Sequence, residues 1–133
     1  MYTHKVQYYE TDRMGITHHS NYIRWMEEAR LDYLSSIGYG YDRLESEGII
    51  SPVVSVECNY KKTTTFYDVV DIDVSVESYN GVKLVINYTM KNSDGATVCE
   101  AHSSHCFLNE NGKPVRMSKE KPEFHEALML SCK

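Results

Sequence analysis

The sequence contains no apolar run that approaches the roughly 20 residues that a membrane-spanning helix needs. Its first residues also lack the apolar stretch of a secretory signal peptide, and we therefore expect a cytoplasmic protein. No CxxC pair occurs among the four cysteines, so we expect free thiols in a reducing compartment. The Walker A, GxGxxG, GxSxG and HExxH patterns are missing as well, which argues against the common nucleotide-binding, serine-hydrolase and zinc-protease sites.

Positive charge is scarce, because 14 Lys and Arg residues stand against 19 Asp and Glu residues. The resulting net charge of −5 argues against nucleic acid as the main partner. The sequence shows no internal repeat, no low-complexity tract and no linker rich in Pro, Gly or Ser. With 133 residues, 41% of them apolar, it has the size and apolar content of one domain, which we expect to span residues 1–133.

One long amphipathic helix is predicted over residues 21–37, because apolar residues recur there every three or four positions. Gly38 follows directly and is a typical helix stop. The apolar face consists of Tyr22, Trp25, Met26, Ala29, Tyr33 and Ile37.

The second half of the sequence has the pattern of an antiparallel sheet. Residues 69–79 alternate between apolar and polar, which is the signature of a half-buried strand, and Asn80-Gly81 predicts a hairpin after it. A sheet with one apolar face needs a cover, and the long helix is the candidate, so we expect an α+β fold in which a curved antiparallel sheet wraps one helix. Further strands are expected at 4–9, 53–60, 82–92 and 96–108, and short helices at 41–47 and 119–130.

The residues before the long helix offer the equipment for acyl hydrolysis. Asp12 lies on a loop that contains Gly15, just before the predicted helix N-terminus. Unpaired N–H groups and the partial positive charge at such an end can stabilise a developing oxyanion. A nearby carboxylate can activate water or attack the carbonyl directly. An Asp in this position is also a common turn former or cap, and the pattern alone leaves both roles open.

This stretch resembles the signature of hotdog-fold thioesterases of the 4-hydroxybenzoyl-CoA and short-chain acyl-CoA type. The resemblance extends over about residues 6–117. It includes His19, which lies two positions before Asn21. The sequence departs from the pattern at Glu10, where the family usually has Asp, and at Met14, where a small residue is frequent. The matching residues are Asp12, Gly15, Asn21, Tyr22, Glu28, Ala29 and Arg30.

The resemblance implies the hydrolysis of an acyl-CoA, or acyl-carrier-protein, thioester to a free acid and a thiol. It gives Asp12 the role of general base or nucleophile. It implies that the backbone N–H of His19 binds the thioester oxygen. It implies no metal and no cofactor beyond the coenzyme A of the substrate. It also implies a homodimer or homotetramer with active sites between subunits, in which Thr63 to Thr65 are candidates for the contact with a partner's pocket.

Other residues receive lesser roles from the same resemblance. Glu28 is a second catalytic candidate on the helix, and its alternative role is support of the loop. The basic clusters, Lys61 and Lys62 with Arg116 and Lys119, are candidates for the phosphates of coenzyme A, although solvated surface charge is the simpler interpretation. The expected substrate-binding residues are Gly15, Asn21, Tyr22, Thr63, Lys61 and Lys62, and Asn21 is expected to brace the loop rather than to take part in chemistry.

Two residue patterns in the sequence resemble sets of metal ligands. His18-His19 is an unlikely metal pair, because adjacent side chains at a helix start are expected to point apart. Cys99-x-x-His102-x-x-His105-Cys106 has the spacing of zinc ligands, but alternation along a strand would place them on two faces.

Two other functions are alternatives to hydrolysis. They are a hotdog acyl dehydratase, which uses a His with a carboxylate, and an acyl-CoA-binding module without activity.

Overall fold

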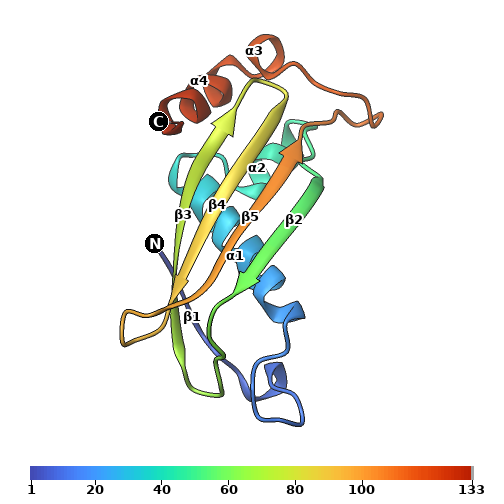
Figure 1. Cartoon of the computed structure of the whole chain (residues 1–133). Helices are drawn as coiled ribbons and strands as arrows, with labels where there is room; N and C mark the ends of the chain where they lie inside the picture. Colours follow the sequence, from blue (N-terminus) through green and yellow to red (C-terminus); the bar gives the residue numbers. More distant parts are fainter. Residues whose placement is uncertain (133) are drawn as a thin grey trace.

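The alternating residues 69–79 form β3 (Val69–Tyr79), in which Val70, Ile72 and Val76 are buried, as the period of two requires. The computed structural model describes residues 1–132 and orders the strands β1-β3-β4-β5-β2 in one antiparallel sheet (Figure 1). The other strands are β1 (Tyr2–Lys5), β2 (Val53–Tyr60), β4 (Lys83–Lys91) and β5 (Thr97–Cys106).

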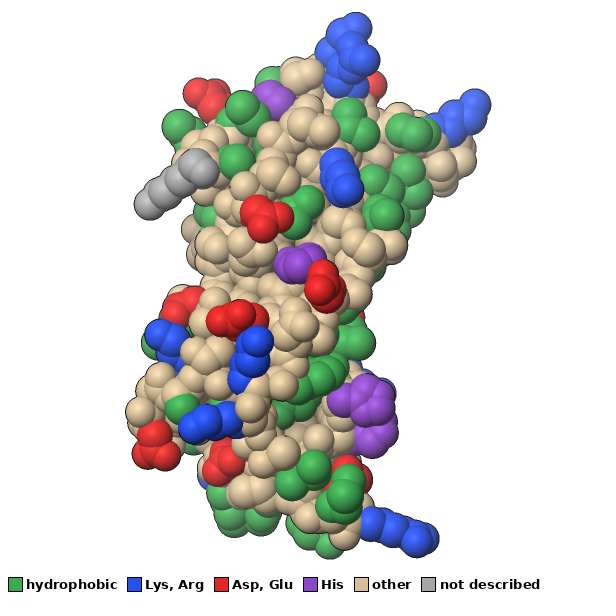
Figure 2. Space-filling view, viewed as in Figure 1, with side chains coloured by type: hydrophobic (Ala, Val, Ile, Leu, Met, Phe, Trp, Pro, Cys, Tyr) green, Lys and Arg blue, Asp and Glu red, His purple; other side chains and the backbone are tan. Residues whose placement is uncertain are grey.

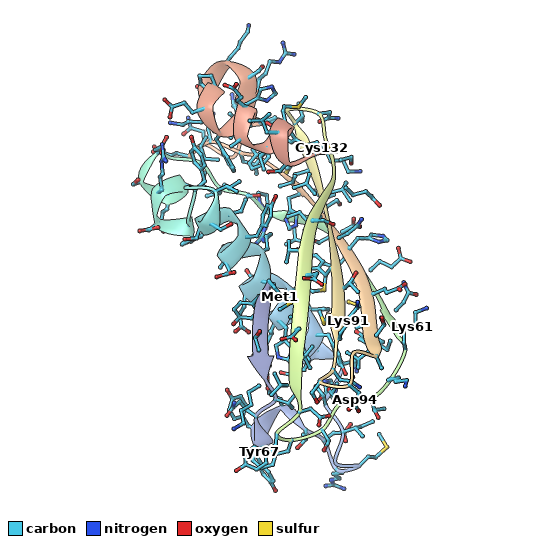
Figure 3. The ribbon with its side chains drawn as sticks, turned by 90° about the vertical axis from the view of Figure 1, so that its left-hand side faces the viewer. Met1, Lys61, Tyr67, Lys91, Asp94 and Cys132 are labelled. Carbon is cyan, nitrogen blue, oxygen red and sulfur yellow. The ribbon has the colours of Figure 1, made fainter. Side chains whose placement is uncertain are left out.

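The predicted amphipathic segment forms α1 (Ser20–Ser36), which crosses one face of the sheet (Figures 1 and 3). Trp25 and Ala29 on α1 are fully buried. The helix ends at Gly38, whose φ of +92° is a left-handed conformation that glycine adopts without strain. The opposite face of the sheet carries charged side chains of both signs without one gathered patch (Figure 2). This arrangement confirms the predicted α+β fold with one long helix and a curved antiparallel sheet.

The first strand is shorter and lies earlier in the chain than predicted. A strand was expected over residues 4–9, but β1 ends at Lys5 and a 3-10 turn, η1 (Tyr8–Glu10), follows. Glu10 closes this turn, because its N–H donates to the carbonyl of Gln7 while its carboxylate accepts from the N–H of Gln7. The turn directs the chain away from the sheet and toward the loop that carries Asp12.

The C-terminal helix predicted over 119–130 consists of two helices, α3 (Met117–Glu120) and α4 (Pro122–Ser131). Proline lacks the N–H that would continue a helix and fits the first turn of a new one, so it separates the two. The predicted short helix near residue 41 is present as α2 (Tyr41–Ser46). Among residues 1–132, no helix is long and apolar enough to cross a membrane.

The sheet has an open edge at β2, the right-hand strand in Figure 1. Val53, Val54 and Val56 are 49%, 60% and 38% exposed along this edge. Ile23 of α1, which is 43% exposed, lines the same side of the molecule as Val53 and Val56. An edge strand presents unpaired backbone N–H and C=O groups, and a valine-rich edge of this length is a ready surface for pairing with another strand.

A chain of buried polar side chains links α1 to the sheet. Arg30 donates from Nη1 to Nδ1 of His105 over 2.7 Å, and Nε2 of His105 lies 2.7 Å from Oγ of Ser103. Ser103 in turn contacts the hydroxyl of Tyr88 at 2.8 Å. Burial, and then the charge of Arg30, lower the pKa of His105 to about 4. The imidazole is therefore neutral at pH 7 and accepts the hydrogen bond from the guanidinium.

We expect acidification from pH 7.5 to pH 5 to lower the free energy of unfolding by roughly 2 kcal/mol through His105. The folded protein keeps this imidazole neutral down to about pH 4, whereas an unfolded chain takes up the proton below a pH of about 6.5. Urea denaturation of the wild type, His105→Gln and His102→Gln at both pH values measures the effect. His102, on the same strand with a side chain 43% exposed, is the matched control. An equal loss in all three proteins would show that His105 is not the cause.

Candidate active site

Asp12 lies on a tight loop whose two sides meet at the bridge between Thr11 and Thr17. The N–H of Asp12 donates to the carbonyl of Ile16, and Oδ1 of Asp12 accepts from the N–H of Met14 at 2.8 Å. This is an Asx turn, so the turn-forming role left open by the sequence is present. Within residues 1–132, Oδ2 of Asp12 accepts no hydrogen bond. One carboxylate oxygen thus fixes the loop, and the other is free to act on a ligand.

Glu10 anchors this loop to the body of the protein, a role that the sequence did not reveal. Its carboxylate is 5% exposed and accepts from Nε1 of Trp25 at 2.7 Å, from the N–H of Gln7 at 2.8 Å, and lies 2.8 Å from Nε2 of His4. Burial would raise the pKa of Glu10, but the hydrogen bonds from His4, Gln7 and Trp25 outweigh it and lower the pKa. An ionised Glu10 therefore ties β1, η1 and α1 together beneath the Asp12 loop.

Asn21 supports the loop from the helix. It is 9% exposed, and Nδ2 donates to the carbonyl of Glu10 at 2.9 Å and to that of His18 at 3.2 Å. The amide faces the loop backbone and does not line the cavity described below. Gly15, at φ +79°, provides the sharp turn, and its carbonyl accepts from Oγ1 of Thr65. Both residues therefore shape the site from outside its wall.

A cavity of about 410 Å³ lies between this loop, the start of α1 and the end of β2. Asp12 and Met14 come from the loop, Tyr22 from α1, and Tyr60 from β2. The structure thus gathers six of the predicted residues around one space. The full lining consists of Asp12, Met14, Ile16, Thr17, His19, Tyr22, Tyr60, Lys61, Lys62 and Thr63.

The backbone N–H of His19 lies at the N-terminal end of α1, where His19 is the cap residue with φ −57°. Within residues 1–132 this N–H makes no hydrogen bond, although the N–H groups of Asn21 and Tyr22 donate to the carbonyls of His18 and His19. An unpaired donor at the positive end of a 17-residue helix is suited to an oxyanion or a polarised carbonyl. Its residue lines the same cavity as Asp12.

The threonines after β2 make hydrogen bonds within their own chain. Thr64 is 2% exposed, and its Oγ1 donates to Oγ1 of Thr17 at 2.6 Å and lies 3.0 Å from the hydroxyl of Tyr22. Thr65 bonds the Asp12 loop through Gly15, as described above. Of the three threonines, Thr63 lines the cavity. The threonines therefore lock the loop onto the end of the sheet.

The two lysines lie at the rim of the cavity, where β2 ends. Lys61, labelled in Figure 3, lies at the end of the sheet away from the chain's C-terminal helices, and the N–H groups of both lysines donate to the carbonyl of Val98. Arg116 is the N-cap residue of α3 and Lys119 lies in this helix, at the other end of the molecule, so the structure separates the two basic groups. Lys61 and Lys62 remain as the cations next to the cavity.

Glu28 does not share the cavity with Asp12. Its carboxylate accepts a 2.7 Å hydrogen bond from the hydroxyl of Tyr2 on β1 and lies 4.0 Å from Nδ1 of His4. Burial, and then this carboxylate, raise the pKa of Tyr2 to about 12. Glu28 therefore contacts β1 and does not line the cavity.

The histidine pair behaves differently from the prediction. The rings of His18 and His19 do not point apart but stack, with centroids 4.3 Å apart, and Nδ1 of His18 contacts Oγ of Ser20 at 2.9 Å. On β5, Cys99 and His105 are buried, whereas His102 and Cys106 are partly exposed, as alternation requires. The part of the chain that the structure describes contains no group of three or more potential metal ligands.

The comparisons with known proteins agree with this geometry. The sequence profile of the thioesterase-like superfamily matches residues 6–129. YneP of Bacillus subtilis is 38% identical over 124 residues, 92% of this chain and 90% of that protein. The acyl-CoA thioester hydrolase YbgC of Escherichia coli is 25% identical over 97 residues, 73% of this chain and 72% of that protein. The DHNA-CoA thioesterase of Staphylococcus aureus has a TM-score of 0.93 and 35% identity, and the match covers 97% of this chain and 87% of that one.

The chain therefore belongs to the thioesterase-like superfamily and has its hotdog fold. The class of enzyme predicted from the sequence, a thioester hydrolase that acts on acyl-CoA, is confirmed by these relatives.

Proposed function

We propose that this chain hydrolyses an acyl-CoA thioester in the cavity between the Asp12 loop and α1. The observation that carries the proposal is the pairing of the free Oδ2 of Asp12 with the unpaired N–H of His19 around one space. The thioester carbonyl accepts the His19 N–H, and the helix end stabilises the oxyanion that forms. Asp12 either takes a proton from the attacking water or adds to the carbonyl itself, and the C–S bond breaks with release of the coenzyme A thiol.

The rim of the cavity supports a substrate with phosphates at one end and an apolar acyl group at the other. Lys61 and Lys62 supply two cations next to the opening, where the phosphates of coenzyme A would find them. Tyr22, Ile16 and Met14 supply apolar surface within the cavity. This reaction uses side chains, a backbone N–H and water.

We further propose a homodimer in which β2 pairs antiparallel with the β2 of a second copy. A homotetramer would consist of two such dimers. The exposed valines of β2 and its free backbone edge support this pairing. In an antiparallel pair of strands, directly opposed residues point to the same face of the sheet. The two α1 helices therefore lie on one face of the joined sheet only if the residue at the two-fold axis is opposed to the same residue of the second copy. Val56 and Glu57 lie mid-strand. Two facing carboxylates are unfavourable, which places Val56 at the axis.

Val56→Glu is expected to weaken dimerisation by at least about tenfold, because it buries two facing carboxylates at the axis. Sedimentation analysis over a range of concentrations measures the change, and thiol release measures its effect on activity. Val82→Glu is the matched control, since Val82 is 44% exposed in the turn between β3 and β4. If Val56→Glu sediments as the wild type does, the β2 edge is not the interface.

The function itself is tested by thiol release from a panel of acyl-CoA substrates with short aliphatic, medium-chain and aromatic acyl groups. We expect turnover of at least one member, and the pattern of rates defines the acyl pocket. Tight binding of acyl-CoA without thiol release would overturn hydrolysis in favour of a binding module. Hydration of an enoyl-CoA without hydrolysis would overturn it in favour of an acyl dehydratase.

A further inference from the structure

Large apolar and aromatic side chains are exposed together at the end of the molecule that carries the Asp12 loop. Tyr8 and Tyr9 of η1 are 74% and 81% exposed, Tyr67 before β3 is 64% exposed, and Met14 of the loop is 76% exposed. The ring of Phe66 joins two of these segments, because its centroid lies 5.6 Å from that of Tyr8 and 3.9 Å from that of Tyr67. We call these five residues the aromatic tip, and Figure 2 shows hydrophobic side chains gathered at this lower end. Single exposed apolar residues are common on proteins, whereas a contiguous group marks a binding surface.

The backbone of Tyr67 has a conformation that tyrosine rarely adopts. Its φ is +75°, and within residues 1–132 it is the one residue other than glycine with a positive φ. Tyr67 is the third residue of a turn in which the N–H of Asp68 donates to the carbonyl of Thr65, and a positive φ at that position suits Gly or Asn. Its ring packs on Phe66 and beneath Nζ of Lys5, 4.6 Å away, at the lower end of the molecule in Figure 3. A strained residue whose side chain stays in solvent points to a function.

The exposed charges around the aromatic tip are positive, although the whole chain has a net charge of −5. In the two segments that form this end, residues 5–17 and 61–69, the carboxylates of Glu10, Asp12 and Asp68 are buried or half-buried and accept hydrogen bonds from backbone N–H groups. Charges farther apart than about 8 Å are largely screened at physiological salt, so an approaching surface meets the local cations rather than the distant acids. The exposed charged residues of the two segments are Lys5, Arg13, Lys61 and Lys62.

The composition and shape of the aromatic tip fit a lipid bilayer better than a second protein. Tyrosine is enriched where membranes meet water, because its ring is apolar and its hydroxyl is polar. Cations at the same level attract the headgroups of anionic lipids. The tip is the narrow end of an elongated molecule (Figure 1), whereas a stable protein interface buries about 800 Å² on each partner. Asp94, in the turn between β4 and β5, lies farther up the sheet than Tyr67 (Figure 3).

We propose that the aromatic tip docks this protein on the surface of membranes that contain anionic lipids. The exposed tyrosines enter the headgroup region, and Lys5 and Arg13, which have no role in the site described above, meet the lipid phosphates. The Asp12 cavity opens beside the bilayer, because Met14 belongs both to its wall and to the tip. In the proposed dimer the two β2 strands run in opposite directions, so the tips lie at opposite ends and one tip meets a given bilayer. Docking is independent of the proposed hydrolysis.

Sedimentation with sucrose-loaded vesicles measures the docking directly. We expect the partition coefficient of the wild type to be at least about tenfold higher for vesicles with about 30% phosphatidylglycerol than for pure phosphatidylcholine. The double variant Tyr8→Ser with Tyr9→Ser should bind the anionic vesicles about tenfold less, because it loses apolar surface that the bilayer would cover. Tyr41→Ser is the matched control, since Tyr41 is 61% exposed on α2, away from the tip (Figure 1). Equal binding by the double variant and the wild type would overturn the proposal.

The cations of the tip are tested by Lys5→Gln and Arg13→Gln. Each variant should lower the partition coefficient by about fivefold at low salt, since a cation near an anionic surface contributes about 1 kcal/mol. The difference from the wild type should shrink in about 0.5 M salt, where charges are screened within a few ångströms. Lys83→Gln removes the same charge from an exposed position at the start of β4, near α3 at the other end of the molecule. An equal loss in Lys83→Gln would show that total charge, and not the tip, governs binding.

Tyr67→Asn separates docking from a structural role of the strained tyrosine. Asn adopts a positive φ more readily than Tyr, so this variant should unfold at a higher urea concentration than the wild type. Its partition coefficient for anionic vesicles should nevertheless fall by about fivefold, because one ring no longer enters the headgroups. A gain in stability with unchanged vesicle binding would contradict the proposal, since the strained ring would then do nothing at a membrane.

Two further measurements separate docking from self-association and from hydrolysis. Sedimentation velocity without lipid should give the same species for the wild type and for Tyr8→Ser with Tyr9→Ser. A smaller species in the variant would make the tip a contact between copies and overturn the proposal. Thiol release without vesicles should be equal in the two proteins. Absence of thiol release from both would remove the proposed hydrolysis alone, whereas failure of the wild type to bind anionic vesicles would remove docking alone.

Discussion

Asp12→Asn should lower kcat for thiol release by about 10²- to 10⁴-fold while the protein keeps its fold. The amide cannot take a proton from water and cannot add to the carbonyl as a carboxylate does. Its oxygen can still accept the N–H of Met14, so the Asx turn that shapes the loop survives the substitution. The loss should therefore appear in turnover, with little change in thermal stability or in acyl-CoA binding.

Glu28→Gln is the matched control for Asp12→Asn, because it makes the same acid-to-amide change on the neighbouring helix. Glu28 contacts Tyr2 outside the cavity, and we expect its loss to alter activity by less than about tenfold. Stopped assays with the best substrate of the panel give kcat and KM for both variants. Equal activity of Asp12→Asn and the wild type would make Asp12 a purely structural turn residue, and a large loss in Glu28→Gln would transfer the chemistry to that carboxylate.

The elements of the fold were predictable where one periodicity dominates. The three- and four-residue spacing of α1 and the alternation of β3 both reflect burial of one face, and the structure has both elements within a residue of their expected bounds. The termini were less predictable. Residues 4–9 read as a strand, but Glu10 turns the chain through contacts with Trp25 and His4, which lie elsewhere in the sequence. No local sequence pattern predicts such a contact.

The candidate site shows the same division. The motif around Asp12 and His19 was visible, because the chemistry needs a carboxylate and a helix N-terminus at close spacing. The anchoring role of Glu10 was hidden, since a buried carboxylate that accepts from an indole is defined only by the packed fold. The Arg30–His105 contact joins residues 75 positions apart. The spacing of residues along the chain predicts neither the contact of Glu10 with Trp25 nor that of Arg30 with His105.

Removal of a single backbone N–H by His19→Pro should lower kcat by about 10²- to 10³-fold, the usual cost of losing one oxyanion donor. The position tolerates proline, because its φ of −57° is close to the angle that the proline ring imposes. No hydrogen bond inside residues 1–132 is lost with this N–H. KM should change much less than kcat, since the developing oxyanion needs the donor more than the ground-state carbonyl does.

His19→Ala is the control, since it removes the imidazole and its stacking on His18 but keeps the N–H. We expect this variant to retain most of the wild-type kcat. Thermal unfolding of both variants shows whether proline has displaced the start of α1, because a proline restricts the preceding residue as well. If His19→Pro and His19→Ala lose activity equally with equal stability, the imidazole is the functional group and the oxyanion donor lies elsewhere. If the loss is confined to proline, the helix N-terminus is the group that stabilises the charge formed on the thioester.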